Sequence, residues 1–99
     1  MTQEMIDKLT EVGFNRWTKG NMDRLYINAA QLGLVCEYYH TGNIKYAELN
    51  GKSVSNSEAR RMKASKTFVD LKTEKVYSDN SALQEAAEAL ILQTVGARE

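Results

Sequence analysis

The chain has 99 residues, 42% of them hydrophobic and 26% charged, and its formal net charge is zero. This length and composition suit one compact globular domain, residues 1–99, and exclude a disordered chain. No apolar run approaches the roughly 18–20 residues that span a bilayer, and no signal peptide is recognisable. Cys36 is the single cysteine, so no internal disulfide can form. We therefore expect a cytoplasmic protein.

The first predicted element is an amphipathic helix over residues 2–12. Its apolar side chains recur at helical spacing. Thr2 is a candidate N-cap, and Gly13 can adopt the left-handed conformation that ends a helix.

A hairpin is predicted next, with strands at residues 14–18 and 23–28 around the turn-rich KGNM. Strand alternation places Leu25 and Ile27 on one face of the second strand. We expect both in the core, together with Trp17.

The sequence NAAQLGL predicts one or two helical turns that Asn28 caps and Gly33 ends. Residues 34–40 and 43–51 then predict a second hairpin around HTGN.

A third helix signal covers about residues 56–65, where Ser55 and Glu58 fit a capping box. Its apolar content is small, so it should lie on the protein surface.

Residues 66–79 predict a third hairpin with a tight turn near Thr73 and Glu74. The clearest helix follows and ends at Gly96, with Ser81 and Gln84 as a second candidate capping box.

The order of these elements predicts an α+β fold, in which three hairpins form a small antiparallel or mixed sheet with helices packed on it. The strand order is not predictable from the pattern.

Catalytic signatures are not found in the sequence. His40 is the only histidine, so no His–His or His–Cys metal pair is expected, and Cys36 in an apolar strand reads as a buried structural thiol. Phosphate-loop, dinucleotide-binding and nucleophile-elbow motifs are missing as well. We therefore expect no enzyme, no cofactor and no metal.

Charge is unevenly distributed along the chain. Residues 16–72 carry ten cations against five acids, an excess of five positive charges that the two ends offset. Such a basic middle favours an anionic partner, although dispersed surface charge gives the same totals.

Two features of this region suggest binding. The predicted helix SEARRMKASK presents cations around most of its circumference. These cations could bind nucleic-acid phosphates or an acidic protein patch. Alternatively, the helix is only solvated and its long side chains cover apolar surface below. Aromatic residues also alternate with cations on the predicted strands, a pattern that suits base stacking, a protein interface or, in part, the core. The candidate binding residues are the cations Arg16, Lys19, Arg24, Arg60, Arg61, Lys63 and Lys66, followed by Trp17 and Tyr26.

The stretches GFNRWTKGNMDRLYINAAQLGL, YYHTGNIKYAELNGKSVSNSEARRMKASKTFVD and KTEKVYSDN resemble a group of small proteins of phages and conjugative elements in Gram-positive gut bacteria. The resemblance implies an accessory protein of a mobile element and brings no catalytic residues with it.

Three functions remain open. The first is a non-enzymatic module that binds an anionic partner, with nucleic acid ahead of an acidic protein surface. The second is a protein–protein adaptor or an inhibitor of a host defence complex, in the manner of anti-CRISPR proteins. The third is a self-associating structural protein that pairs through a strand edge or the last helix.

Overall fold

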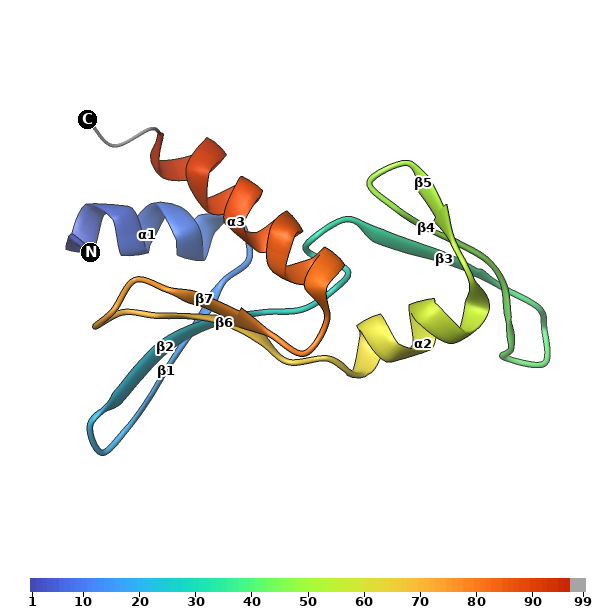
Figure 1. Ribbon diagram of the computed structural model, residues 1–99, viewed down its shortest axis with the longest axis horizontal. Helices are drawn as coiled ribbons and strands as arrows, with labels where there is room; N and C mark the ends of the chain where they lie inside the picture. Colours follow the sequence, from blue (N-terminus) through green and yellow to red (C-terminus); the bar gives the residue numbers. More distant parts are fainter. Residues whose placement is uncertain (97–99) are drawn as a thin grey trace.

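The computed structural model describes residues 1–96 and confirms the α+β fold (Figure 1). Within these residues, five strands lie between the first and second of three helices, and two more strands lie between the second and third. Their bounds are α1 Gln3–Glu11, β1 Asn15–Lys19, β2 Met22–Ile27, β3 Leu34–Tyr38, β4 Ile44–Leu49, β5 Lys52–Val54, α2 Asn56–Ala64, β6 Thr67–Asp70, β7 Val76–Ser78 and α3 Ser81–Val95.

The strands form two antiparallel sheets. The predicted first and third hairpins are β1–β2 and β6–β7, and they join through β2 and β6 into a sheet of order β1-β2-β6-β7. In that pairing Leu25 lies opposite Val69 and Tyr26 opposite Phe68. Everything from β3 to α2 is therefore inserted between two strands that are neighbours in space.

The predicted second hairpin, β3–β4, forms the other sheet together with β5, in the order β3-β4-β5. Strand β5 was not predicted from the sequence. Its signal is the dipeptide Asn50–Gly51, in which both residues have positive φ values, 50° and 86°. An Asn-Gly pair between two strands is the strongest short hairpin signal, and here it returns the chain along β4.

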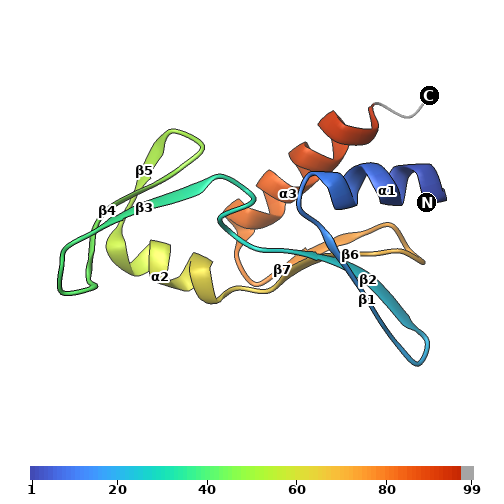
Figure 2. The same cartoon turned by 180° about the vertical axis from the view of Figure 1, so that it is seen from behind.

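Helices α1 and α3 lie together on one face of the four-stranded sheet, whereas α2 packs against β4 (Figure 1). The view from behind shows the same arrangement (Figure 2). Buried side chains from both sheets and all three helices form one apolar cluster, which includes Leu9, Leu25, Ala47, Met62 and Leu83. The predicted core residues Leu25 and Ile27 are both confirmed, with 0% and 3% of their surface exposed.

Most of the predicted helix boundaries are confirmed. The Thr2 and Ser55 side chains accept hydrogen bonds from the Met5 and Glu58 amides, as N-caps do. Residues 29–33 form turns that are not assigned as a helix, and one helical turn is present, because the Leu32 amide donates to the Asn28 carbonyl at 3.2 Å. Asn28 still caps this segment by accepting from the Gln31 amide.

The predicted capping box at Ser81 and Gln84 is wrong, because the N-cap of α3 is Asn80. Its Oδ1 accepts from the amides of Ala82 and Leu83 at 3.0 and 3.2 Å. Its Nδ2 donates to Glu58 at 3.1 Å, which links the starts of α2 and α3. Asparagine caps as well as serine does, so the local pattern allowed either residue.

Asn80→Ala should therefore lower the free energy of unfolding by about 0.5–2 kcal/mol, because two amides at the start of α3 lose their acceptor. Ser81→Ala, one residue further on, is the matched control and should change it by less than about 0.5 kcal/mol. Urea denaturation followed by circular dichroism measures both. A larger loss for the Ser81 variant would contradict the cap assignment.

Candidate functional site

One face of the four-stranded sheet is left open. Helices α1 and α3 lie on the same side of this sheet in both views (Figures 1 and 2). Along β2, Leu25 and Ile27 point toward these helices and are buried, while Arg24 and Tyr26 alternate with them and are only half-buried. The open face therefore carries the side chains at the other set of strand positions.

Four aromatic rings cross this open face, one from each strand. They are Trp17 on β1, Tyr26 on β2, Phe68 on β6 and Tyr77 on β7. Neighbouring ring centroids lie 6.0, 5.1 and 5.3 Å apart along the series, with interplanar angles of 89°, 43° and 27°. These separations are those of favourable aromatic pairs. We call these four residues the aromatic row.

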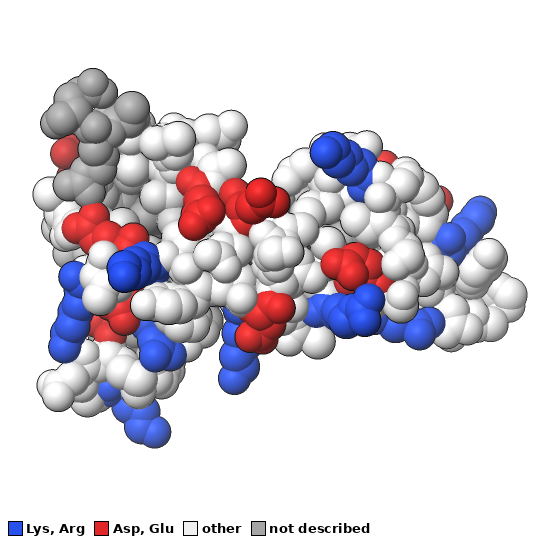
Figure 3. Space-filling view, in the orientation of Figure 1, with Lys and Arg blue, Asp and Glu red and all other residues white. Residues whose placement is uncertain are grey.

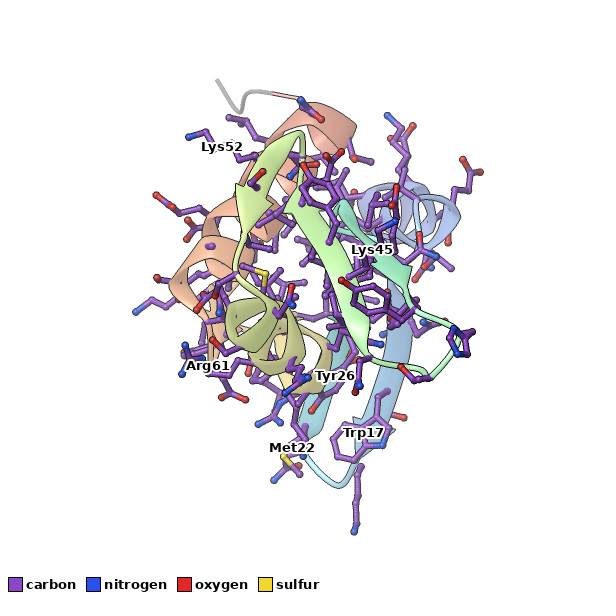
Figure 4. The ribbon with its side chains drawn as sticks, turned by 90° about the vertical axis from the view of Figure 1, so that its right-hand side faces the viewer. Trp17, Met22, Tyr26, Lys45, Lys52 and Arg61 are labelled. Carbon is purple, nitrogen blue, oxygen red and sulfur yellow. The ribbon has the colours of Figure 1, made fainter. Side chains whose placement is uncertain are left out.

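The ends of the aromatic row are its accessible parts. Trp17 exposes 38% and Tyr77 44% of its surface, while Tyr26 and Phe68 between them are half-buried. A flat partner therefore has access mainly to the two outer rings. In the view from the side of α2, Trp17 lies near the tip of the β1–β2 hairpin and Tyr26 closer to the body of the protein (Figure 4).

The prediction that Trp17 belongs to the core is wrong. All five residues of β1 are exposed, because β1 is the outer strand of the sheet and its hairpin extends away from the helices (Figure 1). Trp17 instead packs edge-on against Tyr26.

Arg24 is part of the same surface. Its guanidinium carbon lies 4.3 Å from the centroid of the Phe68 ring, and its Nη1 donates to the Tyr26 hydroxyl at 3.0 Å. Cations over aromatic faces in this range are attracted by the ring quadrupole. The Nε of Arg24 is buried and has no partner among the described residues. An unsatisfied buried donor costs about 1–3 kcal/mol, so the hydrogen bonding of Arg24 is incomplete without a further acceptor.

Asp70 lies opposite Arg24 across the β2–β6 pair, but it does not neutralise it. The Asp70 carboxylate accepts from the amides of Lys72 and Thr73 in the turn after β6. Within residues 1–96, Arg24 therefore forms no ion pair with an acid.

Two of the seven predicted binding cations are neutralised by acids. Arg16 makes a bidentate pair with Asp23 at 2.8 and 3.0 Å, and this hydrogen bonding lowers the pKa of the Asp23 carboxyl below its usual value. Arg61 pairs with Glu58 at 3.2 Å. Both arginines are therefore weaker candidates for anion binding than their sequence positions suggested.

The other predicted cations are not paired with acids within residues 1–96. Lys63 donates to the hydroxyl of Tyr38, whereas Lys19, Arg60 and Lys66 have no side-chain hydrogen bond or ion pair within the described part of the chain. Lys19 belongs to the β1–β2 hairpin, and Arg60 and Lys63 belong to α2.

The seven cations do not form one patch. Positive surface lies over α2 and, separately, over the β1–β2 hairpin, with acids interspersed (Figure 3). Figure 4 likewise shows Lys45, Lys52 and Arg61 at separate places. The structure thus divides the candidates into a hairpin group beside the aromatic row and a helix group around α2.

Two members of the aromatic row, Phe68 and Tyr77, were not predicted. Alternation along the third hairpin already places Phe68 on the face opposite Val69. The local sequence pattern does not specify the pairing of β2 with β6, and it is this pairing that brings Phe68 next to Tyr26.

The residues considered for catalysis lie apart from this surface. Cys36 is a free thiol and is half-buried rather than fully buried, which corrects the prediction, and His40 is exposed in the β3–β4 turn. No group of three or more His, Cys, Asp or Glu side chains within residues 1–96 is placed to hold a metal ion. Over the same range, each helix is too short or too polar to cross a bilayer.

Comparison with protein-family models, curated proteins and solved structures gives no significant match. The site must therefore be interpreted from its own chemistry.

Proposed function

We propose that the chain is a non-enzymatic binding module of a mobile element and that the open sheet face binds single-stranded nucleic acid. The observation that carries the proposal is the aromatic row on a sheet face that the helices leave uncovered. Proteins that bind unpaired bases commonly stack them on aromatic side chains of such a face, and the backbone then follows nearby cations.

Each part of the surface has a role in this proposal. Trp17 and Tyr77, the exposed ends of the aromatic row, would stack on bases. Arg24 and Lys19, which lie two residues from Tyr26 and Trp17 on the same face of β2 and β1, would contact phosphates. The unpaired cations of α2 would add long-range attraction. The resemblance to phage and conjugative-element proteins supports the mobile-element setting.

Binding of a labelled mixed-sequence oligonucleotide, single-stranded DNA or RNA, should be measurable by fluorescence anisotropy at low salt. Two phosphate contacts, from Lys19 and Arg24, predict that a tenfold rise in salt weakens binding to a single strand by roughly 25-fold. A duplex of the same sequence should bind more weakly, because its bases are not free to stack. Absence of binding at low salt would overturn the proposal.

A protein partner is the second candidate function, and the composition of the same surface favours it. Trp, Tyr and Arg are the residues that dominate binding energy in protein interfaces, and the chain carries no net positive charge. The partner would be an acidic or mixed surface, for example on a host defence complex that the chain inhibits. A pull-down from host lysate separates the alternatives, because a protein partner survives nuclease treatment of the lysate and a nucleic-acid bridge does not.

Self-association is the third candidate, through the outer edge of β7 or the exposed part of α3. Light scattering tests it directly, and a monomer at all concentrations would count against it.

A further inference from the structure

A second surface, at the other end of the molecule, has the features of an anion-binding recess. It lies between the turn that joins β3 to β4 and the helix α2, and has a volume of about 510 Å³. Tyr38 and residues 42–44 line one side, while Arg60 and Lys63 line the other. In Figures 1 and 2 the β3–β4 turn and the tip of the β1–β2 hairpin lie at opposite ends of the long axis.

The charge of this recess is positive and uncompensated. Two cations line it, and no acid is among its lining residues. Arg60 has no ion-pair partner within residues 1–96, in contrast to Arg61 beside it, which pairs with Glu58. The partner of Lys63 is the hydroxyl of Tyr38 rather than an acid, and this hydrogen bond raises the pKa of the ammonium group above its usual value. Lys63 is therefore fully charged at neutral pH.

The backbone places these groups together before any ligand arrives. Positions 60 and 63 lie on the same flank of a helix, so both cations face the turn. The β3–β4 register shifts between Glu37 and Tyr38, and such an irregularity re-aims the side chains that follow it. Tyr38 then reaches α2, where its hydroxyl accepts a hydrogen bond from Lys63, and both residues line the recess.

The β3–β4 turn is open to solvent at Gly42. Gly42 has a φ of 93°, and a side chain added at this position would meet nothing within 4 Å. Its amide donates to the carbonyl of Tyr39, which holds the turn closed.

We propose that this recess binds the terminal phosphate of a small phosphorylated molecule. Two unpaired cations match the charge of a phosphate monoester, which is about −1.5 to −2 at neutral pH, better than that of a backbone diester with its single charge. The recess is open to solvent and its volume exceeds what one phosphate needs, so there is also room for the group that carries the phosphate. The inference is independent of the aromatic row and holds whether or not the sheet face binds nucleic acid.

The test is a titration of the ¹⁵N-labelled chain, followed by NMR, with three probes at constant ionic strength: inorganic phosphate, a nucleoside monophosphate and dimethyl phosphate. Saturable shifts at the amides of Gly42, Asn43, Arg60 and Lys63 are expected with the first two, and tighter binding with the nucleoside monophosphate. Equal binding of the diester would overturn the proposal in favour of a backbone contact. Absence of saturable shifts would overturn it outright.

Variants on α2 provide the matched comparison. Arg60→Gln and Lys63→Gln should each weaken binding of the monophosphate at least about tenfold, because each removes a charge-assisted hydrogen bond. Arg61→Gln changes the same residue type on the same helix but lies outside the recess, so its affinity should stay within about twofold of wild type. A loss for Arg61→Gln equal to that for Arg60→Gln would show a general charge effect and refute the site. Circular dichroism confirms that each variant is folded.

Discussion

Replacing Trp17 and Tyr77 together by alanine should weaken the binding of single-stranded nucleic acid at least about 30-fold. Each ring that stacks on a base contributes about 1–3 kcal/mol, and these two are the exposed ends of the aromatic row. Tyr26 and Phe68 would remain to hold Arg24. The loss should therefore come from stacking and leave the salt dependence, which reports on phosphate contacts, nearly unchanged. Anisotropy titrations of the double variant at two salt concentrations measure both quantities.

The matched control is Tyr39→Ala, which removes an exposed ring from outside the aromatic row. Tyr39 exposes 52% of its surface and follows β3 in the other sheet. Its removal should leave the affinity for nucleic acid within about twofold of wild type. If the double variant binds nucleic acid as well as wild type but no longer captures a nuclease-resistant protein partner, the aromatic row is a protein interface instead.

The same variants also test the two proposed binding sites, the aromatic row and the recess at α2, separately. The Trp17 and Tyr77 double variant should keep its affinity for a nucleoside monophosphate, since neither residue lines the recess at α2. Conversely, Arg60→Gln should affect the monophosphate far more than the single-stranded oligonucleotide. Failure of one proposal therefore leaves the other intact.

Strand alternation predicted the faces of β2 correctly but not what covers each face. Leu25 and Ile27 are buried as expected, and Tyr26 points the other way. The same period applied to Trp17 could not show that β1 is an outer strand that extends past α1 and α3. A period of two assigns side chains to faces, whereas burial depends on which helices pack on which face.

Long-range pairing and side-chain geometry explain the other differences. The aromatic row depends on the register that places Tyr26 opposite Phe68, and nothing local to either strand specifies it. The ion pairs of Arg16 with Asp23 and of Arg61 with Glu58 are local, seven and three residues apart, but whether they form depends on side-chain geometry that the charge pattern does not specify. Local signals such as the Ser55 cap were predictable because all of their atoms lie within one turn of helix.

Leu25→Ala should be the most destabilising of the substitutions considered, and it tests the support beneath the aromatic row. Leu25 is 0% exposed and lies opposite Val69, also 0% exposed, on the helix-covered face of the sheet. Truncating a buried leucine costs about 2–5 kcal/mol through lost burial and the cavity left behind. That is a large fraction of the roughly 5–15 kcal/mol that stabilises a typical domain.

Met22→Ala is the control on the same strand, because Met22 is apolar but 41% exposed at the hairpin tip (Figure 4). It should change the free energy of unfolding by less than about 0.5 kcal/mol. Urea denaturation should be followed by far-ultraviolet circular dichroism rather than by tryptophan fluorescence, since Trp17 is partly exposed in the folded protein and reports poorly on the core. A loss below about 1 kcal/mol for Leu25→Ala would contradict the placement of β2 between the core and the open face. A large loss of stability, with normal binding by the protein that remains folded, would show that Leu25 supports the sheet without contacting the ligand. Binding would then depend on the open face, which carries Arg24 and Tyr26.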